Sequence, residues 1–156
     1  MKAVKFLSAL MTSTVLAFSM VSAAHAWSTE KEARTLLKDA ETYIQEKGQE
    51  AALAEFSKNP GPFVRNDLYV FALDEKGNYL ASGADSRLIG KPIMAADAAG
   101  NPVGPRILEV ANKSPAGGDV EYMWLNRSVN KVQKKVSHVK RVGDIVIGVG
   151  NYLPNN

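Results

Sequence analysis

The stretch GGDVEYMWLNRSVNKVQKKVSHVKRVGDIVIGVGNY, residues 117–152, decides the fold. Its last two runs, 132–142 and 144–152, are rich in β-branched residues and are joined tightly around Gly143. Such runs, bounded by turn residues, are typical of strands. A third strand, carrying Tyr122 and Trp124, precedes them, so the sequence predicts three consecutive strands at the end of the domain.

The residues before this stretch predict two helices. Thr29 is followed by Glu32 at the spacing of a capping box, and apolar residues then recur at intervals of three and four. This pattern predicts an amphipathic helix over 30–47 that ends at Gly48. A shorter helical pattern, QEAALAEFSKN, stops at the sequence NPGP.

A β-hairpin is predicted next, because DLYVFAL (67–73) and YLASG are separated by a turn with Gly77 at a position that needs a positive φ. The continuous apolar content of the first strand indicates burial on both faces. Residues 84–105 are predicted to form an ordered loop that passes over the sheet, and PRILEVANKS is predicted to form a short helix. Helices followed by an antiparallel sheet indicate an α+β fold.

The amino terminus has the layout of a secretory signal peptide. Lys2 and Lys5 precede an apolar run, Phe6 to Val21, which ends in small residues and Ala24-His25-Ala26. We therefore expect residues 1–26 to be a signal peptide cleaved after Ala26, with an uncleaved anchor as the alternative. Residues 27–156 then form one exported domain.

Composition excludes several classes of function. Without the signal peptide the chain has 17 basic and 16 acidic residues, so its charges nearly balance. The pI of about 9.1 for the full sequence therefore gives little support for nucleic-acid binding. Cysteine is absent and His138 is the one histidine left, which excludes thiolate metal sites, histidine clusters and paired catalytic imidazoles within one chain. We expect no metal, no cofactor and no enzymatic activity.

Strand parity groups the aromatic and basic residues. Side chains two positions apart on a strand lie on the same face of the sheet. Tyr122 therefore shares a face with Trp124, Tyr69 with Phe71, and Lys135 with Ser137. If the helices cover only one side of the sheet, the other side is lined by rings with a few polar tips, as in a small-molecule pocket. The polar tips are donors, which favour a ligand such as a carboxylate.

A simpler interpretation stays open at this point. Aromatic residues at a period of two are commonly ordinary core, and Lys135 fits a surface lysine whose stem is buried and whose ammonium is solvated. His138 fits a sheet residue with a polar tip.

Several segments, in order, resemble the landmarks of a single Cache domain of the second type: FVRNDLYVFALDEKGNYLASG, LIGKPI, VEYMWLN and KKVSHVKRVGDIVIGVGNY. The resemblance extends from about Ala33 to Tyr152. It implies a PAS-like extracytoplasmic sensor domain, in which a long N-terminal helix packs on one face of an antiparallel sheet and a short organic acid binds on the other. By position it implicates these residues in ligand binding: Tyr69, Phe71, Tyr122, Trp124, Lys135 and Ser137.

The chain departs from the family pattern in two places. His138 stands where the family commonly has tyrosine, and we include it in the ligand-binding set with the expectation of different, pH-sensitive hydrogen bonding. The family's receptors continue into a membrane helix, whereas this sequence ends at YLPNN. We therefore expect a free-standing periplasmic module for a small anionic metabolite that acts with a membrane receptor or sensor kinase. The alternative is a ligand-free interaction protein of the cell envelope with a Cache-like scaffold.

Overall fold

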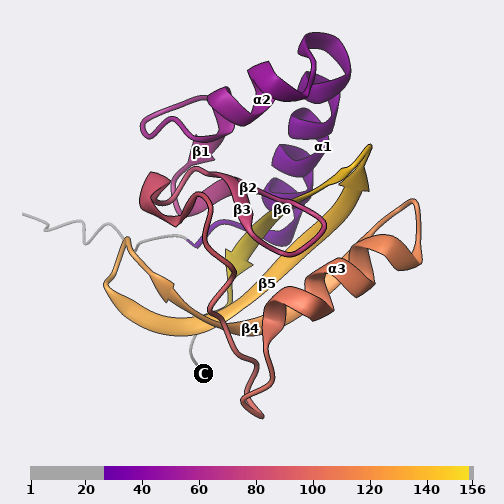
Figure 1. The fold of residues 1–156 in the computed structure, drawn as a ribbon. Helices are drawn as coiled ribbons and strands as arrows, with labels where there is room; N and C mark the ends of the chain where they lie inside the picture. The colour runs from indigo at the N-terminus through magenta and orange to yellow at the C-terminus, as the bar shows by residue number, and fades with distance from the viewer. Residues whose placement is uncertain (1–26, 155–156) are drawn as a thin grey trace, which may run out of the picture.

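The computed structural model describes residues 27–154, and the predicted signal peptide lies outside the described residues. Along the chain, two helices precede a sheet, and a third helix follows the third strand and precedes the fourth (Figure 1). The elements are, in order, α1 (Glu30–Lys47), α2 (Gln49–Phe56), β1 (Val64–Arg65), β2 (Leu68–Leu73), β3 (Tyr79–Ser82), η1 (Ser86–Leu88), α3 (Val103–Lys113), β4 (Gly118–Asn126), β5 (Lys131–Val142) and β6 (Ile145–Tyr152).

The six strands form one antiparallel sheet in the order β1-β2-β6-β5-β4, with β3 paired to β2. The three predicted C-terminal strands are confirmed as β4, β5 and β6. Gly143 turns the chain between β5 and β6 with a φ of 62°. The last strand, β6, lies between β2 and β5, and every one of its residues is buried. The end of the chain therefore forms the middle of the sheet.

The predicted N-terminal helix is confirmed as α1, with both hydrogen bonds of the capping box between Thr29 and Glu32. Gly48 ends the helix with a φ of 85°. One face of α1 is buried against the sheet together with α2, through an apolar core that includes Ala33, Leu36 and Phe56. Helices α1 and α2 thus cover the first face of the sheet.

The second face is covered as well, which corrects the expectation that the helices leave it open. Helix α3 begins at Val103, two residues before the predicted start, and buries Val103, Ile107 and Ala111 at helical spacing. These residues pack on strand residues such as Phe71 and join Ile93 and Ala95 of the loop that precedes α3. Figure 1 shows α3 beside β4 and β5. The apolar stripe of α3 requires such a surface, because a short amphipathic helix is stable only when that stripe is buried.

Candidate functional site

Side chains from β2, β4 and β5 meet between the sheet and its second cover. The hydroxyl of Tyr122 lies 2.9 Å from Ser137 Oγ. The hydroxyl oxygen of Tyr69 accepts two hydrogen bonds, from Lys135 Nζ at 2.7 Å and from Trp124 Nε1 at 3.0 Å. We call these five residues the ring–lysine cluster. The structure thus brings together five of the seven residues predicted for the site.

Lys135 is the charged member of this cluster, and it is 1% exposed. The interpretation of Lys135 as a surface lysine is therefore wrong. Its ammonium lies 4.0 Å from the centroid of the Tyr69 ring and 5.2 Å from that of Tyr152. Within the described chain no carboxylate lies within 4.0 Å of it. Burial lowers the pKa of Lys135 to about 7, although the more distant charge of Asp67 opposes the shift.

Two glycines of β6 make room for the cluster. Gly150 is opposite Ser137 in the sheet, and a Cβ atom there would press on Lys135 Cε and lie 2.5 Å from Ser137 Oγ. Gly148 is opposite Phe71, whose ring occupies the space of the missing Cβ. We did not predict this role, although two glycines two positions apart on a buried strand indicate close packing.

Phe71 lies on the same face but belongs to the apolar core. It is 2% exposed and packs edge-on against Tyr79 at a centroid distance of 6.3 Å. For this residue the structure agrees with the simpler interpretation of an ordinary core ring.

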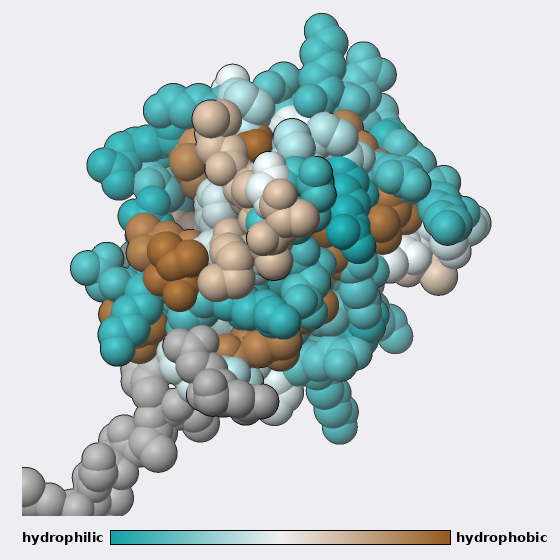
Figure 2. Space-filling view, turned by 90° about the horizontal axis from the view of Figure 1, so that it is seen from below, coloured by the Kyte–Doolittle hydropathy of each residue, from teal (hydrophilic) through white to brown (hydrophobic). Residues whose placement is uncertain are grey.

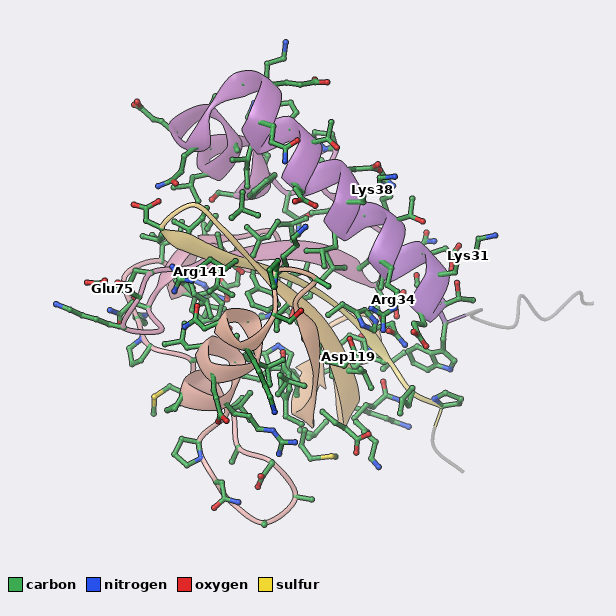
Figure 3. The ribbon with its side chains drawn as sticks, turned by 90° about the vertical axis from the view of Figure 1, so that its right-hand side faces the viewer. Lys31, Arg34, Lys38, Glu75, Asp119 and Arg141 are labelled. Atoms are coloured by element: carbon green, nitrogen blue, oxygen red, sulfur yellow. The ribbon has the colours of Figure 1, made fainter. Side chains whose placement is uncertain are left out.

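His138 lies on the opposite face of the sheet, under α1, and the structure does not bring it to the ring–lysine cluster. Its Nδ1 is 2.8 Å from Asp119 Oδ1, and its Nε2 is 3.0 Å from Asn151 Oδ1. Arg34 of α1 donates to the other carboxylate oxygen of Asp119 at 2.6 Å, and Figure 3 shows these two residues near one another. The physical reason is strand parity, because residues 135 and 138 are an odd number of positions apart.

The residues around His138 are also the described group that most resembles a metal site. Ligand atoms of Glu30, Asp119 and His138 lie within 4.8 Å of one another. Arg34 donates to both carboxylates, at 2.7 Å to Glu30 and 2.6 Å to Asp119. The guanidinium of Arg34 already pairs with both acids and offsets one of their two negative charges, so we interpret the group as an ion-pair network that connects α1 to β4 and β5.

A cavity of about 120 Å³ adjoins the ring–lysine cluster at Tyr69. Its other walls come from the turn between β1 and β2, from Gly83 and Ala84, from the end of β4 and from β6. Three residues that line it were not among the predicted site residues: Asp67, Arg127 and Tyr152. Asp67 lies in the turn that precedes β2, so the alternation of side chains along a strand does not indicate its position.

Two larger hollows, of about 550 and 600 Å³, lie along the start of α1. Their walls are mostly exposed side chains of the helix, such as Lys31 and Thr35. They hold none of the ring–lysine cluster, so we regard the smaller cavity beside Tyr69 as the candidate site.

Burial fixes the protonation of the two tyrosines in the cluster. It raises the pKa of Tyr69 and of Tyr122 well above the ordinary value for tyrosine. Both phenols therefore keep their protons at neutral pH. The site offers hydroxyl, indole and ammonium donors, a set that suits a ligand rich in acceptors.

Comparisons with known proteins agree with this geometry. The family model described as Single Cache domain 2 matches residues 5–155. A methyl-accepting chemotaxis protein from Vibrio parahaemolyticus superposes with a TM-score of 0.65 at 21% identity, over 78% of this chain and 86% of that chain. No curated protein matches the sequence significantly.

Two further solved structures have the same fold. One is described as the structural basis for carboxylic acid recognition by a Cache chemosensory domain, with a TM-score of 0.59 at 21% identity over 80% of this chain and 88% of that chain. The other, a periplasmic sensor domain of a chemotaxis protein, has a TM-score of 0.58 at 18% identity over 80% and 90% of the two chains.

Proposed function

Since this chain belongs to the single Cache domain 2 family, we propose that it is a periplasmic sensory module that binds a short organic acid and acts through a separate membrane protein. Domains of this family are sensory ligand-binding modules. The described residues contain no helix long and apolar enough to cross a membrane. The membrane partner would be a receptor or a sensor kinase.

The buried ammonium of Lys135 is the observation that carries the proposal. An ammonium removed from water without a carboxylate partner is unfavourable, and Lys135 is only 1% exposed, so burial lowers its pKa to about 7. The carboxylate of a bound acid would supply the missing counter-charge. Hydrogen bonds between charged partners are also about twice as strong as neutral ones.

Tyr69 connects Lys135 to the space in which an acid would bind. Its hydroxyl oxygen accepts from Lys135 and Trp124, and its side chain also interacts by a hydrogen bond with Tyr152, which lines the same cavity. The cavity that it lines, about 120 Å³, is well below the roughly 300–1,000 Å³ of pockets for drug-sized ligands. An acid with only a few non-hydrogen atoms fits this size.

Calorimetric titration of the mature protein with acetate, propionate and lactate tests the proposal. We expect at least one acid to bind, and Lys135→Met to weaken its binding at least tenfold. Lys134→Met is the matched control, because that lysine pairs with Glu121 on the opposite face and its side chain is 50% exposed. The proposal fails if no short carboxylic acid, with or without an amino group, binds the wild-type protein, or if Lys135→Met binds as tightly as Lys134→Met.

A ligand-free interaction protein is the second candidate. It is favoured by the mutual hydrogen bonds of Tyr122 with Ser137 and of Lys135 with Tyr69, because side chains that satisfy one another need no ligand. Crosslinking and pull-down from a cell-envelope fraction distinguish the two. If the same membrane protein is recovered with wild type and with Lys135→Met, whether or not acid is added, this second function is supported.

A further inference from the structure

A buried carboxylate, Asp67, lines the same cavity as Tyr69 and is not used by the proposed function. Asp67 is 8% exposed. Its Oδ1 accepts a hydrogen bond from the backbone N–H of Ser28 at 3.1 Å, and its Oδ2 has no hydrogen-bond partner. A buried polar atom without a partner is rare in folded proteins and destabilises the fold.

No cation of the described chain pairs with this carboxylate at close range. In residues 27–154, no lysine, arginine or histidine nitrogen lies within 4.0 Å of it. Arg127, which lines the same cavity, instead donates to Asp85 at 2.8 Å. Lys135 is attracted to Asp67 only across a longer distance. Lys135 and Asp67 are therefore two buried groups of opposite charge near Tyr69 without a close ion pair between them.

Asp67, Tyr69 and Tyr152 all line the cavity of about 120 Å³. A cationic group in this cavity would meet the carboxylate of Asp67 and would lie beside two tyrosine rings, whose faces also attract cations. A simple carboxylic acid would neutralise Lys135 but would leave Asp67 without a partner. Its negative charge would also be repelled by Asp67 in a medium of low dielectric constant.

We propose that the cavity beside Asp67 receives the ammonium group of a short amino acid, whose carboxylate is held at the Tyr69–Lys135 end of the site. This inference rests on the proposed acid-binding function and narrows its ligand class. A zwitterion matches both buried charges at once and adds no net charge to the interior. The small volume restricts the ligand to glycine, alanine or amino acids of similar size.

Paired calorimetric titrations of the wild-type protein test this inference without any variant. Glycine is compared with acetate, and L-alanine with propionate, because each pair differs only in the ammonium group. We expect the better-binding amino acid to bind at least tenfold more tightly than its partner acid. Equal or tighter binding of the simple acids overturns the inference and leaves the acid-binding function standing. If none of the four compounds binds, both proposals fail.

The substitution Asp67→Asn tests whether the ammonium group of the amino acid binds at Asp67. The amide keeps an oxygen that can accept from Ser28 N–H, but it places a donor where the unpaired oxygen was, so the amino acid should lose at least tenfold in affinity. The simple acid should bind as in wild type or more tightly. Asp144→Asn, at an exposed turn, is the control and should change neither affinity. If Asp67→Asn, with a wild-type melting temperature, binds the amino acid as tightly as wild type does, Asp67 is not the ammonium site.

Discussion

Lys135 shows at the scale of one residue how burial sets a charge state. Desolvation brings its pKa to about 7, so near neutral pH small changes in its surroundings decide whether it is charged. An anion bound next to it favours the ammonium form. Acid binding should therefore weaken as the pH rises above about 7.

The same shift predicts how stability depends on pH. The pKa of Lys135 is lower in the folded state, about 7, than its ordinary 10.5, so between these values the unfolded chain binds more protons. Ligand-free stability should thus rise with pH through this window, by roughly 2–3 kcal/mol between pH 7 and 9. Urea unfolding at pH 6, 7 and 9 measures it. Lys135→Met should lose this rise while Lys134→Met keeps it, and parallel curves for wild type and Lys135→Met would contradict the assignment.

At the scale of an element, β6 decides which side chains fit at the centre of the sheet. It lies between β2 and β5, and its two glycines face Phe71 and Lys135. A side chain at either position would have to displace a buried neighbour, and close-packed interiors resist such displacement. The missing side chain of Gly150 thus leaves room for Lys135, and that of Gly148 leaves room for Phe71.

Gly150→Ala tests this role. The new methyl group would press on Lys135 and Ser137, and we expect a loss of about 1–3 kcal/mol in the free energy of unfolding, with weaker acid binding. Gly104→Ala in α3 is the control, because its nearest atom outside the local helix would be 3.7 Å away, at Ile93. A helical alanine there should be neutral or stabilise by up to about 1 kcal/mol. Equal effects of the two substitutions on urea midpoint and binding would exclude the packing role of Gly150.

At the scale of the whole molecule, the sheet is covered on both faces, by α1 and α2 on one and by α3 with its loop on the other. The underside in Figure 2 is accordingly mostly hydrophilic, with apolar areas separated by polar ones. Ser28, at the start of the described domain, is already buried and hydrogen-bonded to Asp67. Ser28, two positions after Ala26, is thus part of the folded domain.

Cleavage after Ala26 is the prediction that belongs to this scale. When the full sequence is expressed in a Gram-negative bacterium, the periplasmic fraction should contain a protein whose first residue is Trp27. Intact-mass spectrometry and N-terminal sequencing of that fraction measure it. Recovery of the uncleaved chain in the membrane fraction would favour the N-terminal anchor instead.

Features that depend on neighbouring residues could be predicted from the amino-acid sequence alone. Periodicity and capping residues gave α1 and its end at Gly48, turn chemistry gave the bends at Gly77 and Gly143, and strand parity placed Tyr122 and Trp124 on one face. Each of these follows from interactions within a few residues of the chain.

Only the tertiary structure decided what covers each face and which charges are paired. Tyr69 and Lys135 are 66 positions apart, and their hydrogen bond exists because β6 joins β2 to β5. The packing of α3 over the rings, the burial of Lys135 and the position of Asp67 in the cavity wall likewise depend on contacts between distant segments. A local sequence pattern predicts the face of the sheet on which a side chain lies. The residue that this side chain contacts depends on the order of the strands and on the packing of the helices against the sheet.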